Sequence, residues 1–136
     1  MNLKLSVIMS ISPDETEINY INSIKSILNQ TINDFEFIIV LDGKHLPNLP
    51  RDDRIVILKN EKRMGLAYSL NRAIDLAKGD FLARQDSDDI SVSNRLEIQY
   101  NCLINNDDLD LVGSDTFFIN SSNNLPTIIA SVISTI

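Results

Sequence analysis

Hydrophobic residues along the chain follow two patterns, short continuous runs and longer segments with helical spacing. Runs rich in apolar and β-branched residues occupy 3–9, 35–41, 54–58 and 81–84. The first two runs are typical of buried strands, and the third and fourth are typical of strands. The sequence therefore predicts four strands, with polar segments between them.

Segments between the runs carry apolar residues three and four positions apart, which is typical of one helix face. The first begins at Ser12-Pro13-Asp14-Glu15, which matches a capping box with proline at the first helical position, and it extends to about Gln30. The second opens at Gly65 and closes at Gly79, and the third is capped by Ser91 or Ser93. The side chains expected to face the core are Ile18, Ile21, Ile24, Ile27 and Leu28 in the first helix, Leu66, Leu70, Ala73, Ile74 and Ala77 in the second, and Leu96, Tyr100, Leu103 and Ile104 in the third.

Strands that alternate with helices predict an α/β fold with a mostly parallel sheet and flanking helices. A further strand-like piece covers 109–113 and continues weakly through 117–119. We expect one domain over residues 1–120, followed by a tail at 121–136 that is not a separate domain. The end of this tail is uncharged and β-prone, so it could pair with the sheet edge or form a homo-oligomer with another copy of the chain.

Three carboxylates stand within four residues, Asp86-Ser87-Asp88-Asp89, just after the fourth predicted strand. If extended geometry continues, Asp86 and Asp88 lean the same way and repel each other unless a proton or cation lies between them. Mg²⁺ and Mn²⁺ suit such oxygen ligands and take further oxygens from phosphates. The alternative is an Asp-rich turn formed for local reasons.

Polar residues also follow the other predicted strands. Ligands of open α/β sheets bind at the carboxyl ends of the strands. We therefore expect these polar residues to lie at the same edge of the sheet as the acidic motif. The four glycines are too dispersed for a phosphate-binding loop, so a diphosphate would need a metal and basic side chains. The residues at these ends are Ser10 after the first strand, Asp42 after the second, and Lys59, Asn60, Lys62 and Arg63 after the third.

Charge and composition narrow the class of partner. A net charge of −7 over 136 residues disfavours nucleic acid, which requires a basic face. A single cysteine, Cys102, excludes an intramolecular disulfide and suits a reducing cytoplasm. No segment approaches the roughly 20 apolar residues that span a membrane, so we expect a cytoplasmic protein without a transmembrane segment, with a peripheral position at the inner membrane face left open.

An ordered series of blocks resembles the N-terminal half of a family 2 glycosyltransferase with the GT-A type fold. The resemblance covers roughly residues 3–120, and the order of the blocks is more specific than any one of them. The blocks are residues 5–10, 26–31, 34–43, 60–66, 77–80, 86–89, 94–96 and 110–113.

This resemblance implies a Rossmann-like, nucleotide-sugar-binding half of a GT-A fold. It implies that Asp42 contacts the nucleotide base, commonly uracil, that Ser10 lies near the base, and that Asp86 approaches the ribose or sugar. Asp88 matches the metal-binding position of the D-x-D motif. The implied reaction is metal-dependent transfer of a sugar from a nucleotide-diphosphate donor, with a UDP-sugar expected, to a polysaccharide or glycolipid acceptor.

Departures from the family pattern limit what this chain is expected to do alone. Leu41 stands where the family often has a first aspartate, and Ser10-Ile11-Ser12-Pro13 replaces its usual base-pocket segment. No acidic residue follows Asp115, so we expect the second half that carries the family's general base to be missing. A general base contributes roughly 10²–10⁴-fold to the reaction rate. The catalytic residue is therefore unknown, and we expect a truncated chain that binds donor and transfers poorly. Two alternatives remain open, a non-catalytic nucleotide-binding or scaffold protein that needs a partner, and a metal-dependent phosphohydrolase.

Overall fold

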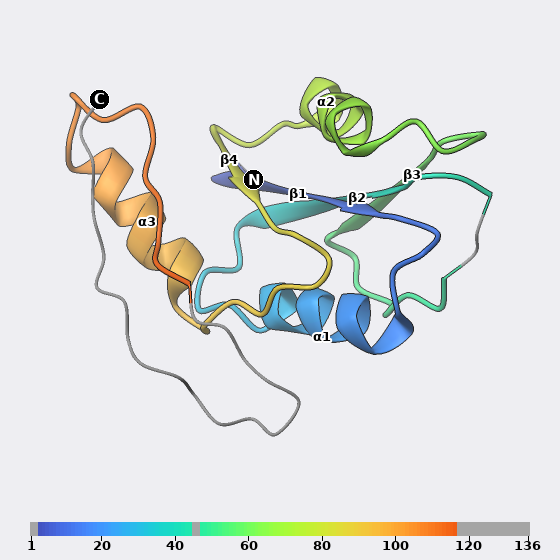
Figure 1. Ribbon diagram of the computed structural model, residues 1–136. Helices are drawn as coiled ribbons and strands as arrows, with labels where there is room; N and C mark the ends of the chain where they lie inside the picture. Colours follow the sequence, from blue (N-terminus) through green and yellow to red (C-terminus); the bar gives the residue numbers. More distant parts are fainter. Residues whose placement is uncertain (1–2, 45–46, 117–136) are drawn as a thin grey trace. The chain divides into compact units, whose positions relative to one another are not determined.

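A computed structural model describes residues 3–44 and 47–116 of the chain. The chain divides into two units, residues 1–97 and 98–136, and the whole sheet belongs to the first (Figure 1). The predicted domain boundary at residue 120, the tail at 121–136 and the strand-like piece at 117–119 lie outside the described residues. The elements are β1 (Leu5–Ile11), α1 (Glu17–Leu28), β2 (Phe35–Leu41), β3 (Ile55–Lys59), α2 (Leu66–Leu76), β4 (Phe81–Arg84) and α3 (Arg95–Ile104).

The sheet is parallel throughout, with strand order β3-β2-β1-β4. β1 lies in the middle, and Leu5 is in register with Phe35 on one side and Phe81 on the other. Every residue of β2 is buried, as expected for a strand covered on both faces. The predicted α/β fold with a parallel sheet is thus confirmed, and the four predicted strands are present with end shifts of up to two residues.

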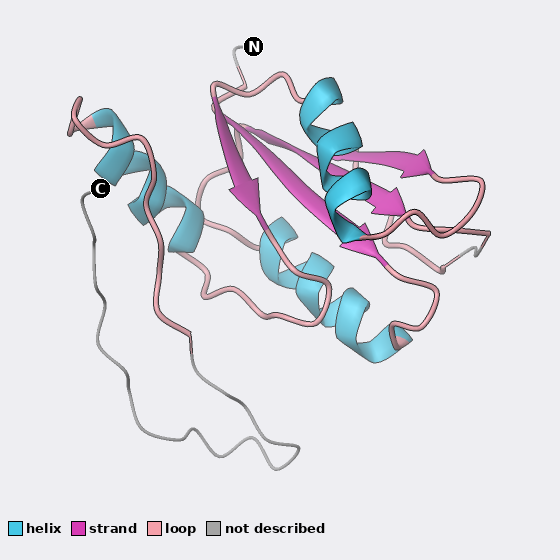
Figure 2. Cartoon of the chain, turned by 45° about the horizontal axis from the view of Figure 1, so that its top comes forward, coloured by secondary structure: helices cyan, strands magenta, loops and turns pink. Residues whose placement is uncertain are grey.

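Helices cover both faces of the sheet, α1 on one and α2 on the other (Figure 2). Tyr20, Ile24 and Ile27 are the buried apolar residues of α1. On the other face, Ala73 of α2 packs in a core cluster with Ile8, Ile38 and Val40 of the sheet, and Val56, Leu58, Leu70 and Ala77 pack against it. These layers fix the carboxyl ends of β1, β2 and β4 at one edge.

The start of the first helix was predicted wrongly. Ser12 does not cap a helix: its carbonyl accepts a hydrogen bond from the Glu15 N–H at 3.1 Å, which closes a turn. The helix begins only at Glu17, and Thr16 is its N-cap residue. A proline preceded by serine also favours a turn, and here the turn prevails.

Several side chains expected to face the core are exposed. Ile18 is 66% exposed because the helix that starts at Glu17 turns Tyr20, Ile24 and Ile27 toward the sheet, and Ile18 lies on the other side. Leu66, Ile74 and Ile104 are exposed as well. The remaining predicted inner-face residues are buried or half-buried.

The strand expected at 109–113 does not form. Residues 111–116 have no regular secondary structure, and Leu111 is 69% exposed. Within the described residues this segment has no strand to pair with, so β-propensity alone is insufficient. Among the helices in the described part of the chain, none has the length and apolar content needed to cross a membrane.

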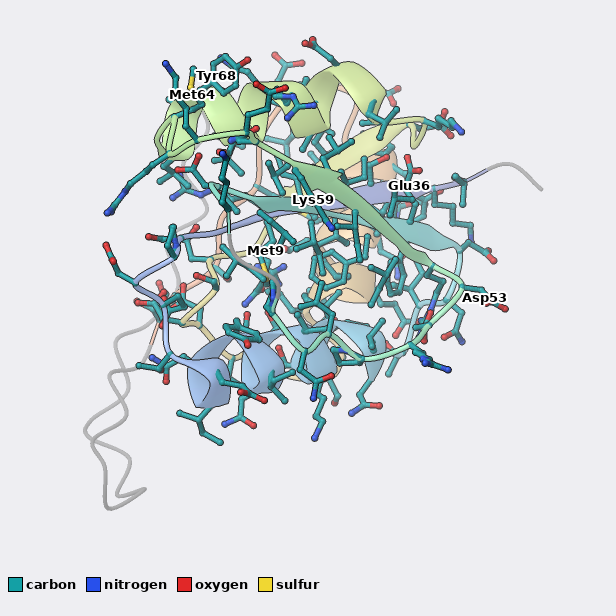
Figure 3. All side chains as sticks on the ribbon, turned by 90° about the vertical axis from the view of Figure 1, so that its right-hand side faces the viewer. Met9, Glu36, Asp53, Lys59, Met64 and Tyr68 are labelled. Atoms are coloured by element: carbon teal, nitrogen blue, oxygen red, sulfur yellow. The ribbon has the colours of Figure 1, made fainter. Side chains whose placement is uncertain are left out.

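A buried acidic side chain fastens the opposite edge of the sheet. Glu36 of β2 (labelled in Figure 3) accepts hydrogen bonds from the Ser6 hydroxyl and the Lys78 N–H, each at 2.6 Å. The Ser6 Oγ in turn accepts the Gly79 N–H at 2.8 Å. The turn between α2 and β4 is therefore bonded directly to β1 and β2.

Candidate functional site

A cleft of about 280 Å³ opens at the carboxyl ends of the strands. We call it the acidic cleft, because three of its lining residues are aspartates. The lining residues as a whole come from the ends of β1, β2 and β4 and from the loop that leads into α2. The lining residues are Ser10, Ser12, Asp42, Arg63, Gly65, Leu66, Asp86, Ser87 and Asp88.

The four residues expected from the sequence to contact nucleotide or metal line this cleft, whereas Lys59, Asn60 and Lys62 are not among its lining residues. Ser10, Asp42, Asp86 and Asp88 come from three different strand ends, as the topology rule for open sheets predicts. Arg63 is the basic side chain that joins them. Their contacts with a ligand stay predictions, but their convergence on one cleft is a property of the structure.

Asp42 is buried, with an exposed fraction of 3%, and one of its carboxylate oxygens already accepts two hydrogen bonds. Its Oδ1 accepts the Met64 N–H at 2.7 Å and the Asn60 side-chain amide at 2.8 Å, and its Oδ2 accepts the Gly65 N–H at 2.9 Å. Gly65 has φ of +92°, a conformation that only glycine adopts readily. The carboxylate thus fastens β2 to the start of α2 while one face of it lines the cleft.

Hydrogen bonding keeps this buried carboxylate ionised. Burial alone would raise the pKa of Asp42, but the hydrogen bonds from Met64, Asn60 and Gly65 outweigh it and hold the pKa below its ordinary value. Asp42 therefore presents an acceptor, and not a donor, to whatever occupies the cleft.

The acidic motif forms a turn as well as a wall of the cleft. The Asp89 N–H donates to the Asp86 carbonyl at 3.2 Å, so the extended geometry of β4 ends at this point. Arg84 holds the Asp86 carboxylate with two hydrogen bonds, at 2.8 and 3.1 Å. Asp88 is exposed and makes no hydrogen bond or ion pair within residues 3–44 and 47–116. The Asp-rich turn and the candidate site are thus the same structure.

Sequence reasoning missed the side chain that positions this turn. The buried Gln85 donates to the Asp89 carbonyl at 2.8 Å and to the Ser23 hydroxyl at 3.0 Å. Ser23 of α1 donates in turn to the Asp86 carbonyl at 2.8 Å. These bonds hold the backbone of the turn and leave its carboxylates available. The sequence shows only that a glutamine precedes the motif, and its partner Ser23 is 62 positions away.

The turn concentrates negative charge. Burial raises the pKa of Asp89 above its ordinary value, and the carboxylates of Asp88 and Asp86 raise it further against the opposing effect of Arg95 and Arg84. In the described part of the chain, no group of three or more His, Cys, Asp or Glu side chains is arranged to hold a metal ion. The carboxylates of Asp86 and Asp88, which line the cleft, would suit an ion such as Mg²⁺ or Mn²⁺, since such an ion takes one or two protein carboxylates and completes its shell with water and phosphate oxygens.

Comparison with known proteins identifies the family of this chain. The model of the glycosyl transferase family 2 matches residues 17–133. The chain belongs to glycosyl transferase family 2. The sequence-based assignment to this family is therefore confirmed.

Curated relatives agree with the assignment. The chain is 39% identical over 129 residues to MJ1057 of Methanocaldococcus jannaschii, an uncharacterized glycosyltransferase, covering 89% of this chain and 44% of the relative. It is 38% identical over 128 residues to the O-antigen biosynthesis glycosyltransferase WbnJ of Escherichia coli, covering 87% and 48%. It is 35% identical over 106 residues to WfgD of Escherichia coli, a UDP-Glc:alpha-D-GlcNAc-diphosphoundecaprenol beta-1,3-glucosyltransferase, covering 74% and 42%. This family 2 chain thus spans less than half the length of each of these relatives.

A solved structure supports the GT-A type fold. S. aureus TarS, residues 1–349, in complex with UDP-GlcNAc, matches with a TM-score of 0.61 at 21% identity, covering 75% of this chain and 31% of that one. At this identity the likeness concerns the fold.

Proposed function

We propose that the acidic cleft binds a nucleotide-diphosphate sugar, most simply a UDP-sugar, and that the chain is the donor-binding part of a glycosyltransferase. The observation that carries the proposal is the convergence of Asp42, Asp86 and Asp88 with Arg63 in one cleft at the strand ends. Asp42 would accept a hydrogen bond from an N–H of the base, and Asp86 would accept one from a hydroxyl of the ribose or sugar.

Asp88 would hold a divalent metal ion, Mg²⁺ or Mn²⁺, against the diphosphate. Among residues 3–44 and 47–116 its carboxylate makes no hydrogen bond or ion pair and it lines the cleft, whereas Asp86 is paired with Arg84 and Asp89 is not a lining residue. When bound, such an ion stabilises the negative charge that develops on the departing diphosphate. Arg63, the basic residue among the described residues that line the cleft, would provide additional positive charge.

The acceptor side of the reaction is proposed from the relatives. The name of WfgD specifies a GlcNAc-diphosphoundecaprenol acceptor, and that of WbnJ specifies O-antigen biosynthesis. We therefore propose a saccharide or lipid-linked acceptor for the glycosyltransferase to which this chain corresponds. An acceptor of this kind would bring the protein to the cytoplasmic face of a membrane.

Calorimetry of UDP, GDP and dTDP binding, with and without Mn²⁺, tests the donor site and its metal. We expect one of the diphosphates to bind in the presence of Mn²⁺, and Asp88→Ala to weaken that binding about tenfold or more, since a charge-assisted ligand is lost. Asp75→Ala removes the same charge from an exposed position on α2 and should leave binding unchanged. Binding that needs no metal would overturn the role of Asp88, and absence of binding to all three would overturn the donor site.

A further inference from the structure

Three side chains that do not line the acidic cleft form a chain of hydrogen bonds behind Asp42. Asn60, at the end of β3, donates from Nδ2 to Asp42 Oδ1 at 2.8 Å and to the Ser69 Oγ at 2.9 Å. Arg72 of α2 donates from Nη1 to Asn60 Oδ1 at 2.6 Å and to the Lys59 carbonyl at 2.9 Å. Asn60 and Ser69 are buried, with exposed fractions of 4% and 0%.

The arginine permits only one orientation of the Asn60 amide. A guanidinium can donate hydrogen bonds but cannot accept them, so the Oδ1 of Asn60 must face Arg72. The Nδ2 must then face Asp42, where the carboxylate accepts it. Arg72 and the ionised Asp42 therefore require the same orientation of the amide, with Oδ1 toward Arg72 and Nδ2 toward Asp42.

This arrangement leaves Asp42 a single acceptor position for a ligand. A carboxylate oxygen accepts about two hydrogen bonds, and Oδ1 already accepts Asn60 and Met64. Oδ2 accepts only Gly65. A ring N–H of uracil, thymine or guanine can donate to the remaining position, whereas cytosine and adenine present an unprotonated ring nitrogen there.

We infer that Asn60, oriented by Arg72, is a positioning residue that makes Asp42 select nucleobases with a ring N–H. The inference rests on the proposed donor site and goes beyond it by locating the base preference in residues that do not touch the ligand. Among the described residues, Arg63, Asp86 and Asp88 line the same cleft as Asp42, and Arg72 of α2 bonds Asn60.

The test compares binding of UDP and CDP by the full chain with Mn²⁺ present, from pH 5.5 to 8.5. The ratio of the two affinities cancels the titration of the diphosphate, which both ligands share. The wild type should prefer UDP by a ratio that changes little over this range. Asn60→Asp places two carboxylates side by side, so a shared proton at low pH supplies the hydrogen bond that the amide supplied.

The ratio for Asn60→Asp should therefore be near that of the wild type at pH 5.5 and fall about tenfold by pH 8.5, when the proton is lost. Asn22→Asp adds the same charge to an exposed position on α1 and should retain the wild-type ratio. Arg72→Ala, at a less buried position, should lower the ratio at every pH, and Arg72→Lys should largely restore it.

Two results separate the inference from the function on which it rests. If the wild type prefers UDP and both Asn60→Asp and Arg72→Ala keep that preference at pH 8.5, the positioning role is wrong and the donor site stands. If the wild type binds neither diphosphate, the donor site is wrong and the inference falls with it. Thermal unfolding of each variant identifies any that do not fold, and the Arg72 pair provides the test if Asn60→Asp is one of them.

Discussion

Among single residues, Gly79 shows most directly how closely the turn between α2 and β4 packs against the backbone of β1. A Cβ atom at this position would lie 2.4 Å from the backbone carbon of Leu5 and from the nitrogen of Ser6. Both neighbours belong to the central strand and cannot move aside. The close approach is needed because the Gly79 N–H donates to the Ser6 hydroxyl.

Gly79→Ala should destabilise the protein by about 3 kcal/mol, since a forced overlap with backbone cannot be relieved by a rotamer change. Gly113→Ala is the matched control, because a Cβ there has no heavy atom within 4 Å. It should change stability by no more than about 0.5 kcal/mol. Urea denaturation of both variants measures the difference, and similar midpoints would contradict the packing described for Gly79.

Among the elements, α1 carries two isoleucines whose surroundings differ completely. Ile24 is 0% exposed against the sheet, whereas Ile18 is 66% exposed. Both fit the same periodic pattern in the sequence, so only the observed start of the helix separates them. The inner face of α1 also carries Ser23, which bonds the acidic turn.

Ile24→Ala should cost about 3 kcal/mol of stability, because a buried side chain is lost and a cavity remains. Ile18→Ala, on the same helix, should cost about 0.5 kcal/mol or less. Thermal or urea unfolding measures both. A large effect at Ile18 would mean that the helix presents a different face to the sheet.

The elements also indicate how far sequence reasoning reaches. The bounds of β2 and β4 were predicted to the residue, because each is a short, mostly apolar run bounded by polar residues, although β2 is buried throughout and β4 is only partly buried. The start of α1 was predicted wrongly, because the same residues at 12–15 satisfy a capping box and a turn. Ser10, Asp42, Asp86 and Asp88 could be placed together because topology alone brings strand ends to one edge.

The partners that orient those residues could not be predicted. Asn60 meets Asp42 from 18 positions away, and Gln85 meets Ser23 from 62 positions away. Each bond depends on the register between two strands or on the depth of a helix against the sheet. No local pattern in the sequence encodes either quantity.

At the scale of the whole molecule, Arg54 joins parts of the first unit that are distant in sequence. Its Nη2 donates to the Leu28 carbonyl at the end of α1 at 3.0 Å, and its guanidinium lies 4.7 Å from the centre of the Phe35 ring in β2. Asp52 holds the same guanidinium with hydrogen bonds at 2.9 Å. The hydrogen bonds from Arg54 lower the pKa of Asp52 from 3.8 to about 2.

This pair makes stability depend on pH in the acid range. Because the folded-state pKa is depressed, the contribution of Asp52 is present above about pH 4 and is lost as the pH falls toward 2. Asp52→Asn should cost about 1 kcal/mol at pH 7, after allowance for solvent screening. Urea unfolding at several pH values should show the two proteins converging as the pH falls from about 4 to about 2. A constant difference over this range would contradict the role of the carboxylate.

The central position of β1 determines when the first unit can complete itself during synthesis. β1 is the first strand to be made, yet one of its edges waits for β4, the last strand of the sheet, which begins at Phe81. Pairing across such a separation closes a long loop and slows folding. A ribosome must therefore release most of the unit before the sheet can close, and until then β1 presents an unpaired apolar edge that chaperones could recognise.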